Sequence, residues 1–102
     1  MLRGVRGAIT VKTNEPEAIK TAVIELLNII LNKNQIKISD IACTEFTMTK
    51  DLDCVYPAKY AREIPGFEKV PLMCYQELDI KNSLPKCIRV LVLINTDKSQ
   101  ED

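Results

Sequence analysis

Two adjoining stretches, Cys74-Tyr75-Gln76-Glu77-Leu78-Asp79 and Lys86-Cys87-Ile88-Arg89-Val90, decide how this chain is organised. Together they predict the end of one strand, a loop and a second strand. The second strand, Ile88 to Ile94, is apolar at every position except Arg89, which is typical of a central strand covered on both faces. Its guanidinium needs an anionic or polar partner, because a buried unpaired charge is very costly. Glu77 is the nearest acid in a similar setting, so a structural Arg–Glu pair and a small-anion site are both open alternatives.

The length and charge of the chain narrow the class of protein. The 102 residues predict one domain, spanning 1–102. Lys plus Arg and Asp plus Glu both number 14, so there is none of the basic excess that nucleic-acid and membrane-surface proteins show. We find no apolar run long enough to cross a bilayer and no signal peptide, so we expect a cytoplasmic protein. An anion site must therefore come from local clustering of basic side chains.

The cysteine and histidine content limits the chemistry further. The sequence has no His, and its four cysteines, Cys43, Cys54, Cys74 and Cys87, form no CxxC motif. Scattered positions of this kind disfavour a zinc site, so we expect no metal and four reduced, mostly buried thiols. The lack of His removes Ser–His and Cys–His nucleophilic catalysis.

The hydrophobic pattern predicts four strands and two helices. The strands are expected at 2–11, 41–47, 70–78 and 88–95. A long helix begins at 13–17, with Asn14 as its cap and Glu17 completing a capping box, and ends at 32–34. A short helix over 56–62 is opened by Pro57. Residues 96–102 are polar and are expected to form a frayed tail.

Two positional relations bear on a binding site. Lys59 and Arg62 share one face of the short helix, where two cations repel unless an anion lies near them, although two solvated side chains would be the commoner case. Cys74 and Glu77 have opposite parity, so a regular strand would send them to opposite faces. They can line one pocket only if the strand ends or bulges at 75–76.

Five segments, in this order and at matching spacing, resemble the AroH-type chorismate mutases of the Bacillus class. They are Arg3-Gly4-Val5-Arg6-Gly7-Ala8, Thr49-Lys50-Asp51-Leu52-Asp53, Tyr56-Pro57-Ala58-Lys59 with Arg62, Val70-Pro71-Leu72-Met73-Cys74 with Glu77, and Lys86-Cys87-Ile88-Arg89-Val90. Each segment is weak alone, but together they cover residues 3–97, nearly the whole chain.

The resemblance implies a fold, an assembly and a reaction. The fold would be α+β, a mixed sheet with helices on one face, and three subunits would form a pseudo α/β-barrel with active sites between them. The reaction would be the Claisen rearrangement of chorismate to prephenate, without metal or cofactor. One subunit would supply the catalytic residues Arg6, Cys74, Glu77 and Arg89. The neighbour would supply Tyr56, Ala58, Lys59 and Arg62, and Met73 would also contact the substrate.

Two departures from the family leave a second alternative open. Tyr56 stands where phenylalanine is usual, and the chain ends at Asp102, before a family strand that carries a substrate-contacting tyrosine. We expect either a truncated chain or a natural short form of the family, with lowered activity and an uncovered sheet edge. The alternative function is a trimeric small-anion-binding or regulatory domain with little turnover.

Overall fold

The computed structural model describes residues 1–100 and contains a four-stranded mixed sheet. Its strands are β1 (Leu2–Thr10), β2 (Ile41–Met48), β3 (Leu72–Gln76) and β4 (Cys87–Asn95), in the spatial order β1-β4-β2-β3. The central strand β4 pairs antiparallel with both β1 and β2, and β3 pairs parallel with β2. The stretch that carries Arg89 is therefore central in the sheet, as its apolar sequence predicted.

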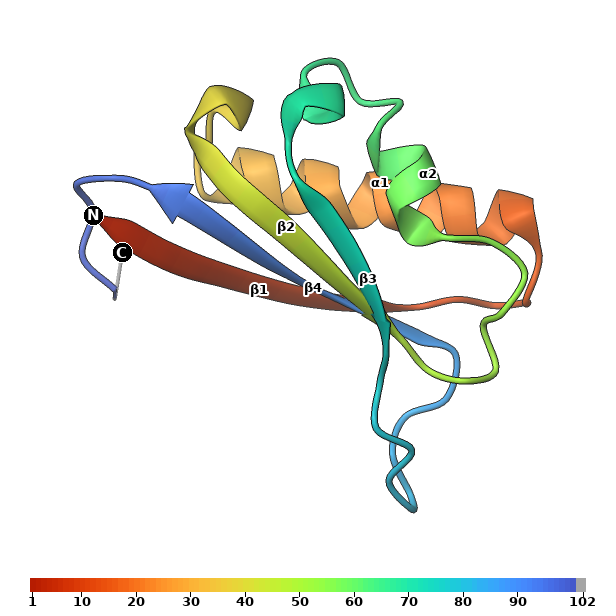
Figure 1. Cartoon of the computed structure of the whole chain (residues 1–102). Coiled ribbons are helices and arrows are strands. Elements are labelled where there is room, and N and C mark those ends of the chain that lie inside the picture. Colours follow the sequence, from red (N-terminus) through yellow and green to blue (C-terminus); the bar gives the residue numbers. More distant parts are fainter. Residues whose placement is uncertain (101–102) are drawn as a thin grey trace.

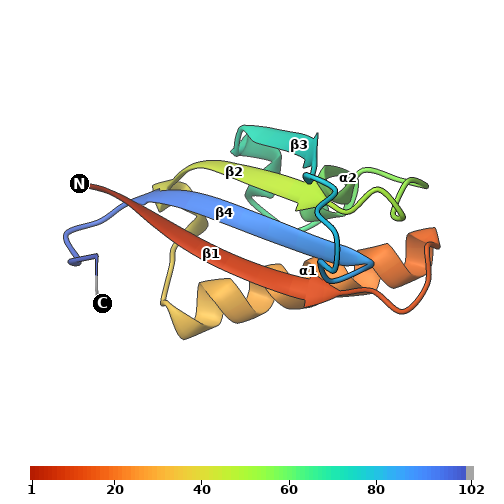
Figure 2. The same cartoon turned by 90° about the horizontal axis from the view of Figure 1, so that it is seen from below.

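Both helices lie on the same side of this sheet. They are α1 (Pro16–Lys33) and α2 (Pro57–Ala61), and single 3-10 turns precede β2 (Ile38–Asp40) and β3 (Phe67–Lys69). Figures 1 and 2 show α1 crossing one face of the sheet, with α2 beside it. The buried residues of α1 recur at helical spacing and pack on the inward side chains of the strands, among them Phe46, Ile88 and Val92. The predicted α+β class, with helices on one face of a mixed sheet, is confirmed.

The opposite face of the sheet is not covered by any helix or strand of residues 1–100 (Figure 1). The strands alternate between buried residues, which face the helices, and more accessible ones, which face away. We call this second surface the open face. By strand register it consists of Gly4, Arg6, Ala8, Cys43, Glu45, Thr47, Met73, Tyr75, Arg89, Leu91 and Leu93. Arg89 therefore stands on a strand that is covered on one side only within the single chain.

Several local predictions were wrong in detail. Helix α1 begins after Glu15 without a side-chain cap, because the Asn14 amide bonds instead to Asp53, with Nδ2 to Oδ1 at 2.6 Å. Strand β3 is shorter than the predicted 70–78, since it begins at Leu72 and ends at Gln76.

The polar segment after β4 is tied to the rest of the chain over its first residues. Thr96 exchanges backbone hydrogen bonds with Met1, and Lys98 donates through Nζ to the carbonyl oxygen of Asn34 at 2.8 Å. The expectation of a frayed tail is therefore wrong for 96–98, and 101–102 lie outside the described residues. No helix within residues 1–100 has the length and apolar character needed to cross a membrane.

Candidate active site

Arg89 and Glu77 form an ion pair on the open face. Arg89 Nε donates to Glu77 Oε1 at 2.7 Å, and Thr47 Oγ1 donates to the same carboxylate oxygen at 3.1 Å. The Glu77 side chain is 17% exposed and the Arg89 side chain 49% exposed. Within residues 1–100, the two terminal guanidinium nitrogens of Arg89 and Glu77 Oε2 bond to no other group. The pair therefore holds the guanidinium in place and leaves both partners able to bind a ligand.

Arg6 adds a second cation to the same face. It lies opposite Leu91 in the β1–β4 register, which makes it a diagonal neighbour of Arg89. Residues in this relation lie roughly 7–8 Å apart, within reach of two long basic side chains that bind one ligand. Arg6 is exposed and makes no hydrogen bond or ion pair within the described part of the chain. Two guanidinium groups thus point to the same side of the sheet with their donors available.

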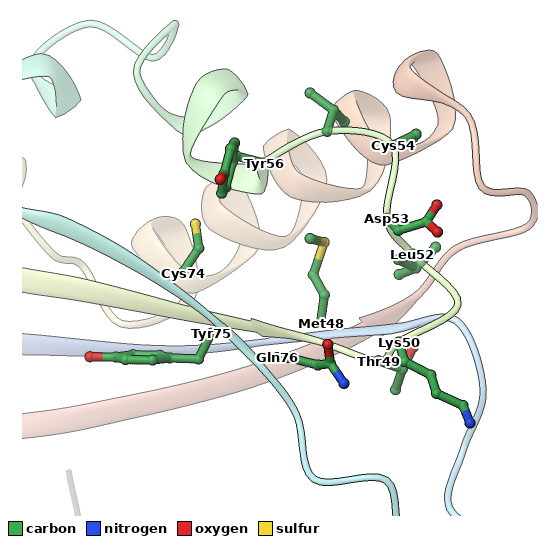
Figure 3. Close-up of a pocket in the computed structure, with 11 residues that line it drawn as sticks. Met48, Thr49, Lys50, Leu52, Asp53, Cys54, Tyr56, Cys74, Tyr75 and Gln76 are labelled. Atoms are coloured by element: carbon green, nitrogen blue, oxygen red, sulfur yellow. The ribbon is translucent and has the colours of Figure 1, made fainter.

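A separate pocket lies near the carboxyl ends of β2 and β3 (Figure 3). It has a volume of about 480 Å³, and its walls come from the segment 48–56 and from residues 74–76. Figure 3 shows Met48, Cys74 and Tyr56 pointing into the same space. Tyr56 is 71% exposed at the start of α2, so its ring can cover or contact a molecule that enters.

The structure separates Cys74 from Glu77 within one subunit. Strand β3 does end at Gln76, but its pairing with β2 is regular, and no bulge changes the side on which its residues project. Cys74 pairs with Phe46 and projects to the helix side, whereas Glu77 bonds to Thr47 and Arg89 on the open face. The expectation that one chain brings Cys74 and Glu77 into one pocket is therefore wrong.

The other predicted residues of the short helix and of β3 differ in accessibility. Lys59 and Arg62 are exposed, and Lys59 Nζ lies 5.7 Å from the centre of the Tyr60 ring. Ala58 is only 5% exposed, so its side chain belongs to the core. Met73 is exposed on the open face, in register with Glu45. The structure thus leaves Lys59, Arg62 and Met73 accessible but does not bring them to Arg89 within one chain.

The thiols are less buried than the sequence predicted. All four are free: Cys87 is buried, Cys43 and Cys74 are half-buried and Cys54 is exposed. Burial raises the pKa of the Cys87 thiol, an effect that the nearby positive charge of Arg89 partly opposes. Residues 1–100 contain no cluster of three or more Cys, Asp or Glu side chains that could hold a metal ion.

The segment 48–51 has contacts that sequence reasoning missed. Asp51 accepts from the N–H of Lys86, just before β4, and Thr49 accepts from the N–H of Cys87, the first residue of β4. The Met48 carbonyl oxygen accepts from the backbone N–H of Glu77. The hydrogen bond from the Thr49 hydroxyl is the main reason that the pKa of the Asp51 carboxyl is lowered, and the Lys86 N–H adds to it. The only sequence signal was the presence of Thr49-Lys50-Asp51 among the segments that resemble the family.

Comparison with known proteins matches this arrangement to one enzyme family. The family model described as chorismate mutase type I matches residues 2–102. The chain belongs to this family. It is 41% identical over 101 residues to chorismate mutase AroH of Bacillus subtilis (strain 168), a match that covers 99% of this chain and 80% of the relative. It is 47% identical over 102 residues to chorismate mutase AroH of Thermus thermophilus, covering 99% of this chain and 83% of that protein.

A solved chorismate mutase structure confirms the fold at the level of coordinates. The enzyme from Clostridium thermocellum superposes with a TM-score of 0.92 at 42% sequence identity. The match covers 96% of this chain and 87% of the other. The fold that carries Arg6, Glu77 and Arg89 is therefore the fold of a solved chorismate mutase, as the resemblance implied.

Proposed function

We propose that this protein is a chorismate mutase that converts chorismate to prephenate without a cofactor, in phenylalanine and tyrosine biosynthesis. Membership of the type I family supports the reaction. The observation that supports it most directly in the chain is Arg89, which Glu77 holds by Nε at 2.7 Å while its terminal nitrogens stay available. Free thiols are typical of a reducing compartment, so we assign the reaction to the cytoplasm.

The chemistry requires binding and charge stabilisation more than it requires a reactive side chain. In the rearrangement the ether C–O bond breaks as a new C–C bond forms, within one molecule and with no net gain or loss of protons. Negative charge grows on the ether oxygen as the C–O bond lengthens. A fixed guanidinium at that oxygen stabilises the transition state more than the ground state. We assign this role to the terminal nitrogens of Arg89.

The other charged groups of the open face would hold the substrate in its reactive conformation. Chorismate has two carboxylates, and a guanidinium can bind a carboxylate with two parallel hydrogen bonds. We assign one carboxylate to Arg6. The free oxygen of Glu77 would accept the substrate hydroxyl, and fixing the ring in this way lowers the entropic part of the barrier.

We further propose that the sites lie between the subunits of a homotrimer. The open face includes the apolar side chains of Leu91, which is 38% exposed, and Leu93. Its β3 edge is also unpaired within the described chain. The alternation of the parallel ladder leaves the backbone N–H and C=O of Cys74 pointing outward, away from β2. These features suit contact with another subunit.

The separation of Cys74 from Glu77 changes how the site would be shared. One subunit would supply Arg6, Glu77 and Arg89 from its open face. The next would supply Cys74 and Tyr56, which line one pocket together, with Lys59 and Arg62 adding positive charge at the entrance. Met73 and the backbone at Ala58 would complete the neighbour's contribution. This division resolves the parity conflict without any bulge in β3.

The test is steady-state conversion of chorismate, followed by loss of its ultraviolet absorbance, in the unmodified protein and in Arg89→Ala. We expect clear turnover in the first and a loss of kcat of about a hundredfold to a thousandfold in the second. Arg3→Ala is the matched control, because Arg3 bonds to the Lys98 carbonyl oxygen and lies away from the site. Its kcat should stay unchanged. Tight chorismate binding without turnover would instead establish the small-anion-binding alternative.

A further inference from the structure

We propose that Asp51, acting with Thr49, is a positioning residue that fixes Arg89 relative to Glu77; this inference rests on the function proposed above. The hydrogen bonds of both side chains go to each other and to the backbone that leads into β4. They would therefore act on the reaction through the strand that carries Arg89.

Lys86, which precedes β4, and Cys87, its first residue, are held by side chains of the segment 48–51. The Lys86 N–H donates to both carboxylate oxygens of Asp51, at 3.1 and 3.0 Å. The Cys87 N–H donates to Thr49 Oγ1 at 3.0 Å, and the Thr49 N–H donates to the Cys87 carbonyl oxygen at 3.1 Å. The Thr49 hydroxyl in turn donates to Asp51 Oδ1, which joins the two contacts into one network. This network ends two residues before Arg89.

Asp51 binds Lys86 while the backbone of Lys86 is in an unfavourable conformation. Lys86 has a φ of 47°, in the left-handed region that residues with a Cβ rarely adopt. Its carbonyl oxygen accepts from the Val11 N–H at 2.7 Å, so both backbone groups of Lys86 are bonded. A charged acceptor on the Lys86 N–H offsets the strain, since hydrogen bonds to a carboxylate are stronger than those to neutral groups. Losing Asp51 would therefore free Lys86 to return to an ordinary conformation and turn the start of β4.

The same segment also holds the other partner of the ion pair. The Glu77 N–H donates to the Met48 carbonyl oxygen at 2.8 Å, next to Thr49 in the chain. Residues 77–86 therefore form a loop whose two ends are both attached to 48–51, and Figure 1 shows this loop extending away from the sheet. The distance between Glu77 and Arg89 thus depends on one short segment that touches the backbone at both ends of the loop.

The experiment compares variants that remove or keep these hydrogen bonds. Thr49→Val removes the hydroxyl but keeps the shape of the side chain, and Thr49→Ser keeps the hydroxyl. Asp51→Asn replaces one carboxylate oxygen with an NH2 group, which cannot accept a hydrogen bond, and leaves the remaining oxygen as an uncharged and therefore weaker acceptor for the Lys86 N–H. Asp79→Asn is the matched control, because Asp79 pairs with Lys50 of the same segment at 2.8 Å but is 58% exposed and does not contact β4.

We expect Thr49→Val and Asp51→Asn to lower kcat by about tenfold to a hundredfold, with a smaller change in KM. The reason is that displacing Arg89 weakens the binding of the transition state more than the binding of the substrate. Thr49→Ser and Asp79→Asn should keep kcat within about twofold of the unmodified protein, as expected for changes that leave the bonds to β4 intact. All four proteins are assayed well below their melting temperatures, so that a loss of stability alone would not change kcat.

A second measurement tests whether the effect passes through Arg89. In an Arg89→Lys background the planar fork is already lost, so adding Asp51→Asn should cost much less than it does in the unmodified protein. Equal costs in both backgrounds, or a normal kcat in folded Thr49→Val and Asp51→Asn, would overturn the inference while leaving the proposed function in place. Lack of turnover in the unmodified protein would overturn the proposed function and this inference with it.

Discussion

Arg89 illustrates how much a single side chain can reveal in the sequence. Its position in an apolar strand predicted a carboxylate partner, and Glu77 is that partner at 2.7 Å. The sequence could not predict on which face Cys74 lies relative to Glu77, because that depends on whether a strand bulges. Nor could it predict the contact between the Asp51 carboxylate and the backbone N–H of Lys86, because such a donor is present at almost any residue type.

The four thiols should differ in their rates of alkylation. Cys54 is exposed, whereas Cys87 is fully buried and has a raised pKa, so less of it is the reactive thiolate at any pH below that value. We expect iodoacetamide to label Cys54 first and Cys87 last, as measured by peptide mass spectrometry on the folded protein. Cys54→Ser should remove the fast phase. Equally fast labelling of Cys87 would mean that the start of β4 is not packed as described.

The strands and the long helix were predictable because they are periodic. Alternation and apolar runs located all four strands, and the 3.6-residue repeat located α1 through to its end at Lys33. The start of α1 lies within the predicted 13–17, but its cap was mispredicted, because the Asn14 side chain has a partner in Asp53, which lies 39 residues away in the chain. Local rules for helix caps cannot include a competitor that only the tertiary fold brings near.

The contact between β1 and α1 should depend on a glycine. A Cβ atom added at Gly7 would lie 2.8 Å from Ile30 Cδ1 and 3.1 Å from Leu26 Cδ1, so these two side chains would have to move. We expect Gly7→Ala to lower the free energy of unfolding by about 1 kcal/mol, measured by urea denaturation at one fixed protein concentration.

Gly4→Ala is the control for this change. Its Cβ would lie 3.4 Å from Leu91 and 3.5 Å from Leu93, which is ordinary contact distance. The same substitution also restricts the unfolded chain, so it should be neutral or slightly stabilising. If Gly7→Ala proved as stable as Gly4→Ala, β1 and α1 would not pack as closely as the structure indicates.

The assembly could be expected from the chain only through the family that it resembles. A single subunit presents Arg6 and Arg89 on the open face and Tyr56 and Cys74 in a separate pocket near the carboxyl ends of β2 and β3. Nothing in the periodicity of the sequence says how two such surfaces meet. The residue types were therefore predictable, whereas the distribution over two subunits that we propose depends on the face on which the fold places each residue.

Mixed trimers offer a direct test of shared sites. We expect a trimer in solution, with a mass about three times 11.5 kDa by light scattering. Arg89→Ala subunits and subunits with both Lys59→Ala and Arg62→Ala should each have low kcat/KM. Co-expressed in equal amounts, they should regain roughly a quarter of the normal activity, since each interface draws its two halves independently. No recovery in proven mixed trimers, or a monomer at micromolar concentration, would contradict sites between subunits.

The strand order β1-β4-β2-β3 has a consequence for how the protein folds during its synthesis on the ribosome. The last strand to be synthesised, β4, lies between β1 and β2 and is the only partner of β1 in the described sheet. Until it emerges, β1 has no strand to pair with, and α1 has only part of its packing surface. Such distant pairing delays folding and leaves apolar strands exposed for longer. A nascent chain of this protein should therefore remain a client for chaperones until Cys87–Asn95 has left the exit tunnel, and its sheet should then close in one late, cooperative step.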